Sequence, residues 1–217
     1  INAAGWPQSF DLSGTMGRDD GAPLLLPISG AETYVDSADI SVRFNSAAED
    51  LWRADIAARG FTRTGLALEE AFIRGGGKID QTSNTVSGSL SYGATGVQLD
   101  DTTVSQALGD RVNGLIQFTS VAGGLTEIPT LTLYGAGLRP GVATTLDPTG
   151  EEYLVTTKGR LQAQGLGRFA SLASLPGLGG AAEVAFDGTV RPLSSAADMR
   201  IDAKTTDLAI GIEQLDA

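Results

Sequence analysis

Alternation of apolar and polar residues is the feature that most constrains the fold of this chain. From Ala38 to Phe44, apolar residues occupy one parity, whereas Asp39, Ser41 and Arg43 occupy the other. Successive side chains of a β-strand point to opposite faces, so a period of two predicts a strand with one apolar face. The same alternation recurs to the end of the chain, which predicts a mainly β protein.

Glycine- and proline-containing segments predict the turns between these strands. These predicted turns lie at residues 75–78, 113–114, 135–137, 139–141, 147–150 and 176–177, and residues 45–50 are predicted to form a loop. Pro192 limits any strand there to an edge or an end, because proline lacks a backbone N–H. Gly77-Lys78 does not indicate a phosphate loop, since Ile79 follows the lysine where Ser or Thr is required.

Two segments have the spacing of short amphipathic helices, Thr102–Leu108 and Phe169–Leu175. Asp101 is a plausible N-cap for the first of them, and Gly109 a plausible C-terminal cap. Glycine clusters about 60 residues apart, with strands and one helix between them, predict a repetitive, elongated architecture. No internal boundary is indicated, and the chain starts at Ile1 rather than Met. We therefore expect residues 1–217 to be one segment of a longer repetitive β-sheet protein.

Composition excludes several classes of function. The net charge of −11 repels phosphate backbones and argues against nucleic-acid binding. With no His and no Cys, the chain lacks the usual neutral-pH base and the thiol nucleophile, so we expect no enzyme activity. We also expect no cofactor and no metal. No apolar run is long enough to span a bilayer as a helix, and no signal peptide is visible.

Strands with one apolar and one polar face form a sheet whose apolar face must be covered. It is either an ordinary protein core or the lining of a groove in which lipid tails replace a second protein layer. The candidate lining residues are Ile40, Val42, Phe44, Trp52, Ile56, Leu68, Ile116, Phe118, Leu131, Leu133, Val184, Phe186, Met199, Ile201, Leu208 and Ile210.

Three segments resemble the TamB family, which belongs to the AsmA-like group of bridge-forming envelope proteins. They are Gln98–Gly114 (QLDDTTVSQALGDRVNG), Gly159–Ala173 (GRLQAQGLGRFASLA) and Gly179–Val190 (GGAAEVAFDGTV). The resemblance extends over residues 52–217. It implies an elongated, U-shaped (taco-like) β-sheet with an apolar concave face and a few short amphipathic helices.

The resemblance also implies a location and a function. The parent protein is expected in the periplasm, anchored in the inner membrane by an N-terminal helix that these residues lack. Its expected partners are phospholipid acyl chains and TamA, an outer-membrane barrel of the Omp85 type. Its expected roles are phospholipid transport between the inner and outer membranes, assistance of outer-membrane protein assembly, or both. The alternative is a structural β-solenoid or adhesin-like passenger segment with a closed, dry core.

Overall fold

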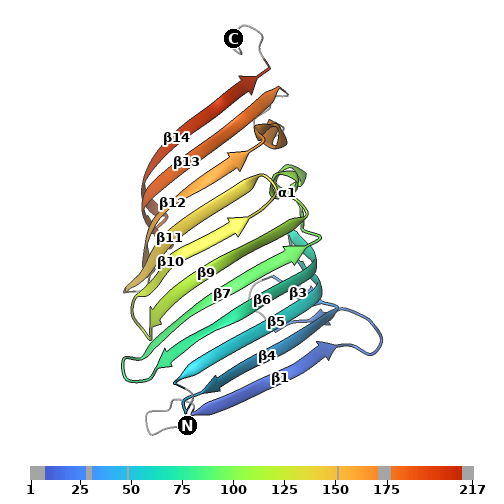
Figure 1. Ribbon diagram of the computed structural model, residues 1–217, viewed down its shortest axis with the longest axis vertical. Coiled ribbons are helices and arrows are strands. Elements are labelled where there is room, and N and C mark those ends of the chain that lie inside the picture. Colours follow the sequence, from blue (N-terminus) through green and yellow to red (C-terminus); the bar gives the residue numbers. More distant parts are fainter. Residues whose placement is uncertain (1–7, 28–30, 48, 151, 171–176, 212–217) are drawn as a thin grey trace.

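The computed structural model describes residues 8–27, 31–47, 49–150, 152–170 and 177–211. These residues form a single antiparallel sheet of 14 strands whose order follows the chain (Figure 1). The first and last strands each have one neighbour on this path, so the sheet is open. The mainly β prediction is therefore confirmed, and the open sheet is consistent with the expected taco-like form. No helix in the described ranges is long and apolar enough to cross a membrane.

The main path of the sheet is a simple meander in which each strand pairs with the preceding strand of the path. Its strands are β1 (Ser9–Gly17), β4 (Ser37–Asn45), β5 (Leu51–Arg63), β6 (Leu66–Asp80), β7 (Thr85–Thr95), β9 (Arg111–Val121), β10 (Thr126–Tyr134), β11 (Leu138–Thr149), β12 (Glu152–Gln164), β13 (Leu178–Arg191) and β14 (Ala196–Ile210). Three short strands lie off this path: β2 (Leu24–Leu25) pairs with β3 (Thr33–Val35), β3 also pairs with β5, and β8 (Gln98–Leu99) pairs with β6. Figure 1 shows the strands side by side from β1 to β14, with the sheet twisting along this direction.

Several predicted turns are confirmed. β4 ends at Asn45 and β5 begins at Leu51, in agreement with the predicted loop, and Gly135–Gly137 connects β10 to β11. The turn predicted at 147–150 begins only at Gly150, which has a φ of 72°, because residues 147–149 belong to β11. β13 ends directly before Pro192, as the missing N–H of proline requires. Of the turn predicted at 176–177, only Gly177 lies among the described residues.

Three predicted turns are wrong, because the glycines concerned lie inside strands. Gly75–Gly77 is inside β6, Asn113–Gly114 is in β9, and Arg139–Gly141 is in β11. β6 instead ends at Asp80, where Ser83 and Thr82 donate backbone hydrogen bonds to the carboxylate at 3.2 Å and 2.9 Å. These two bonds lower the pKa of Asp80. These interior glycines make room for neighbouring side chains and backbone, as described below.

The helix α1 (Thr102–Leu108) forms where the sequence predicts it. Asp101 Oδ1 accepts a hydrogen bond of 3.0 Å from the N–H of Val104, and Gly109 follows the helix with a φ of 83°. Both predicted caps are therefore present. The predicted second helix falls largely outside the described residues, but its first residue, Phe169, ends the 3-10 helix η1 (Leu166–Phe169), which packs beside α1.

Replacing Asp101 with alanine should lower the free energy of unfolding by about 1 kcal/mol, the usual cost of losing an N-cap. Urea unfolding of both proteins measures this difference. The matched control is Asp100→Ala, because the backbone N–H of Asp100 donates to Gly65 O and the substitution leaves this hydrogen bond in place. Equal losses in the two variants would contradict the capping role of Asp101.

Candidate functional site

Strand register places most of the candidate lining residues on one face of the sheet. Residues paired directly across antiparallel strands share a face. Ile40 is paired with Ile56, and Phe44 with Trp52. Further along, Ile116 is paired with Leu131. We call this surface the apolar face. It carries thirteen of the sixteen candidates: Ile40, Val42, Phe44, Trp52, Ile56, Ile116, Phe118, Leu131, Leu133, Val184, Phe186, Met199 and Ile201.

The other three candidates occupy different positions. Leu68 is paired with Phe61 in β5, and the alternation of β6 places it with Phe72 on the opposite face. Leu208 lies in a bulge of β14, where the register shifts after Thr206. Ile210 follows that bulge and is paired with Leu178 at the end of β13.

The register also adds residues that the sequence analysis missed, mainly on β6, β7, β11 and β12. Their strands carry glycine or threonine at neighbouring positions of the same face, which weakens the apolar alternation. With these residues the apolar face is continuous from β1 to β14. The added residues are Phe10, Leu12, Ile73, Val86, Leu90, Tyr92, Val142, Leu146, Val155, Leu161 and Val190.

Large side chains on the apolar face lie over glycines of neighbouring strands. The ring of Trp52 occupies the space where a side chain at Gly88 would lie, and its Nε1–H donates to Ser87 O at 3.0 Å. The same ring is 6.2 Å from that of Phe118, although β5 and β9 are separated by two strands. Glycine thus gives the bulky residues room to cover the sheet surface.

The same arrangement recurs at other places on the apolar face. Tyr92 crosses Gly114 of β9, and its O–H donates to Thr132 O of β10 at 2.8 Å. The ring of Phe186 lies against Gly159 in β12. The interior glycines therefore make room for large side chains that reach over them from the adjacent strand or from the strand beyond it.

Tyr92→Phe should lower the free energy of unfolding by about 1 kcal/mol near neutral pH, the typical net value of one hydrogen bond. Partial burial raises the pKa of the Tyr92 phenol, so the folded protein favours its neutral form. The unfolded chain ionises first, near pH 10, and the contribution of Tyr92 is therefore lost as the pH rises above that value. Urea unfolding of Tyr92→Phe and of the unaltered protein should show a smaller difference in the free energy of unfolding at pH 11 than at pH 8. A difference that grew with pH would contradict this account.

The apolar face has no second layer of protein within the described residues. Each main-path strand packs chiefly against its neighbours in the sheet, and the helices contact β8, β13 and each other. Exposure consequently varies along the face. Phe44 is 2% exposed beneath its neighbours, whereas Leu12 on β1 is 61% exposed and Ile201 on β14 is 65% exposed.

The opposite face, which we call the polar face, is lined by charged residues that form cross-strand pairs. Arg43 pairs with Asp11 at 3.2 Å, and Arg74 with Asp55 at 3.0 Å. These side chains are more than half exposed, so each pair contributes little to stability. The exposed charges indicate that the polar face is the solvated side of the sheet.

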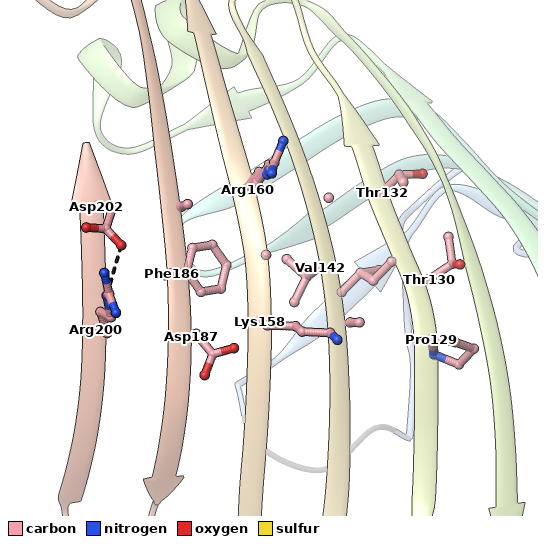
Figure 2. Close-up of a pocket in the computed structure, with 15 residues that line it drawn as sticks. Pro129, Thr130, Thr132, Val142, Lys158, Arg160, Phe186, Asp187, Arg200 and Asp202 are labelled. Atoms are coloured by element: carbon pink, nitrogen blue, oxygen red, sulfur yellow. Dashed lines mark hydrogen bonds and ion pairs between the residues drawn. The ribbon is translucent and has the colours of Figure 1, made fainter. Parts of the chain in front are cut away.

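The polar face nevertheless contains a hollow of about 790 Å³. Figure 2 shows it between β10 and β14, with Lys158 and Arg160 of β12 near its centre and the ion pair of Arg200 and Asp202 at its edge. A twisted sheet is saddle-shaped, so each of its faces is hollowed along one diagonal. The sequence analysis missed this hollow because it arises from the twist and not from a residue pattern.

Comparisons with known proteins leave the family of this chain open. No protein-family model matches the sequence, and no curated protein and no solved structure matches it either. The functional argument therefore depends on the geometry of the sheet and on the residues of its two faces.

Proposed function

We propose that this chain is a segment of a bridge-forming envelope protein, similar to the TamB family, that holds phospholipid acyl chains on its apolar face. The observation that carries this proposal is the continuity of that face. Aliphatic and aromatic residues follow one another across the main path from β1 to β14, and the described residues supply no layer above them. Monomeric soluble proteins rarely leave an apolar surface of this extent open.

The dimensions of the sheet suit a lipid chain. The main path has eleven strands, and a strand spacing of about 4.8 Å gives a face roughly 50 Å across. One leaflet of hydrocarbon is about 15 Å thick, half of the ~30 Å core of a bilayer. Several acyl chains could therefore follow one another along the face.

The chemistry of the face suits movement as well as binding. Each methylene removed from water contributes about 0.8 kcal/mol, and this gain does not depend on direction. The apolar face offers dispersed contacts such as Val142, Val155 and Leu161, with no charged side chain among them. An acyl chain can exchange one set of such contacts for the next without meeting a deep free-energy minimum.

Location and partners form part of the same proposal and derive from the resemblance. The parent protein would be periplasmic, anchored in the inner membrane, and would contact the Omp85-type barrel TamA. An apolar face of this kind could also hold strands of an outer-membrane protein during assembly. The alternative of a closed, dry solenoid core needs a second layer over the apolar face, which the open sheet does not favour.

Quenching of Trp52 fluorescence by brominated phospholipid tests the proposal. Trp6 and Trp52 are the two tryptophans, so a Trp6→Phe variant reports on Trp52 alone. Because the Trp52 ring lies on the apolar face against Phe118, an acyl chain brominated near its middle should quench it strongly. The unbrominated lipid should not quench it, and a soluble headgroup without acyl chains should not compete. Unchanged fluorescence at saturating brominated lipid would overturn the proposal.

A further inference from the structure

Gly141 marks an open place in the hollow of the polar face. It is paired with Thr132 of β10 and with Arg160 of β12, so it lies on the same face as their side chains. A Cβ added at Gly141 would meet no atom within 4 Å, and Gly141 is one of the residues that line the hollow. The surface above this glycine is therefore empty.

Gly141 differs in this respect from two other interior glycines of the polar face. In β6, a Cβ at Gly76 would lie 3.3 Å from the side chain of Arg53. In β7, the ring of Phe72 occupies the space that a side chain at Gly93 would need. At those two positions the protein fills the space with its own side chains, whereas at Gly141 it does not.

The residues around Gly141 form a furrow along β11. Its floor consists of Gly141 and Ala143, which have little or no side chain. One wall carries the hydroxyl groups of Thr130 and Thr132 on β10, and the other carries Lys158 and Arg160 on β12. Because neighbouring strands are about 4.8 Å apart, the backbones of the two walls are roughly 10 Å apart. We call these six residues the β11 furrow.

The charged neighbours of Gly141 on this face are all cations. Arg160 is its direct cross-strand partner, Lys158 lies diagonally from it on β12, and Arg139 precedes it by two residues on β11. The whole chain has 26 acidic residues against 15 basic ones. Three cations without an acid around one position are therefore the opposite of what the composition favours.

The protein neutralises these cations poorly. Lys158 and Arg139 form no ion pair with any other described residue. Figure 2 shows the Lys158 side chain pointing over β11 and away from Asp187, its cross-strand partner on β13. Arg160 lies 3.9 Å from Glu183, and its side chain is 72% exposed, so this pair is weak.

The carboxylates of the same surface lie further from Gly141. Asp187 and Asp202 belong to β13 and β14, on the other side of β12. Glu127 is paired with Thr145, four residues along β11 from Gly141, which corresponds to about 14 Å. An anion above Gly141 would thus be close to cations and hydroxyl groups and separated from these acids.

We propose that the β11 furrow binds the phosphoryl group of a phosphate monoester. Such a group carries about two negative charges and three acceptor oxygens at neutral pH. Arg160 can donate two parallel N–H groups to these oxygens, Lys158 supplies a compact positive charge, and the threonine hydroxyls are further donors. A carboxylate has one charge and two oxygens and would use fewer of these groups. The furrow lies on the polar face, so this inference is independent of the proposed lipid binding on the apolar face.

Titration calorimetry with inorganic phosphate at low ionic strength tests the site. We expect saturable binding with one phosphate per chain. Lys158→Gln and Arg160→Gln should each weaken it about 10-fold, the equivalent of one charge-assisted hydrogen bond. Both residues are exposed, so the fold should be unchanged, and circular dichroism checks this.

The matched control is Arg200→Gln, which removes a cation from the same hollow. Arg200 is already paired with Asp202 at 3.1 Å and lies two strands from Lys158, on the far side of β13. This variant should change phosphate affinity by less than about 2-fold, because the field of an already paired charge is weak. No saturable binding by the unaltered protein, or equal weakening in all three variants, would overturn the proposal.

Gly141→Glu tests the position of the site without removing a cation. The space above Gly141 can accept a side chain, so stability should stay close to that of the unaltered protein. The new carboxylate would lie among Arg139, Lys158 and Arg160 and compete with the ligand for them. Phosphate binding should therefore be lost. Unchanged phosphate affinity in this variant would place the bound anion elsewhere and contradict the proposal.

A soluble ester and a lipid headgroup can both present a phosphate monoester, and two further ligands distinguish them. Glycerol 3-phosphate represents the soluble source in calorimetry, and vesicles containing phosphatidic acid represent the headgroup in a flotation assay. Binding that Gly141→Glu abolishes assigns that source to the furrow. Vesicle binding that Gly141→Glu leaves unchanged belongs to the apolar face and points to the soluble ester. If Gly141→Glu alters the binding of neither ligand nor of inorganic phosphate, the proposal is wrong.

Discussion

Replacing Gly77 with alanine is expected to destabilise the fold by about 3 kcal/mol or more, above the usual range for single substitutions. Gly77 lies inside β6, near its C-terminal end, on the apolar face. An added Cβ would collide with the backbone carbonyl oxygen of Ser87 and approach the Cα of Gly88, both on β7. Backbone atoms in the middle of a sheet cannot move aside as a flexible side chain can, so the two strands would have to separate.

The matched control is Gly141→Ala in β11, where an added Cβ meets no atom within 4 Å. This variant should change stability by less than about 1 kcal/mol, and alanine could even stabilise it by restricting the unfolded chain. Urea unfolding of both variants measures the contrast. Equal stability of the Gly77 and Gly141 variants would show that β6 and β7 are not packed as closely as described.

Phe118→Arg is expected to reduce phospholipid binding at least 10-fold while lowering the free energy of unfolding by only about 1 to 3 kcal/mol. Phe118 is half-buried beside the Trp52 ring, and an aromatic pair of this kind contributes about 1 kcal/mol beyond burial. On an open face the arginine can reach water, so its effect on folding is limited. An acyl chain crossing it would have to strip that water at a cost of several kcal/mol. Leu133→Glu should behave in the same way.

The control is Thr119→Arg, which places the same charge one residue away on the polar face of β9. Its lipid binding and its stability should both be close to those of the unaltered protein. Thermal unfolding and brominated-lipid quenching, measured on the same samples, separate the two effects. Unfolding of the Phe118 and Leu133 variants, with no lipid bound by the parent protein, would favour a closed, dry core and contradict the proposed conduit.

The sequence predicts the β content and most of the apolar face because both depend on local alternation. From Ile40 to Phe44 and from Trp52 to Ile56, parity alone is enough to place the side chains. In β6 it is not, because apolar residues occur at both parities between Leu66 and Ile73. The face of Leu68 is determined by its partner Phe61 on another strand, which no local pattern contains.

The interior glycines are mispredicted for a related reason. A glycine cluster normally indicates a turn, since glycine has the widest backbone freedom. The cluster at Gly75–Gly77 instead makes space for contacts with β5 and β7, including the backbone of Trp52 and of Ser87. These contacts join residues that are far apart in sequence and appear only once the strands are paired. The two faces of the sheet are thus predictable strand by strand, whereas the packing between strands is not.

The most direct test of lipid binding is photo-crosslinking at adjacent positions on opposite faces. Benzoylphenylalanine placed at Ile116 or Leu161 lies on the apolar face, whereas Gln117 and Gln162, one residue further along each strand, lie on the polar face. After irradiation with phospholipid, we predict lipid adducts at Ile116 and Leu161, with at least 10-fold less at Gln117 and Gln162. Equal labelling of both faces, or labelling confined to the glutamine positions, would contradict the proposal that the apolar face holds acyl chains.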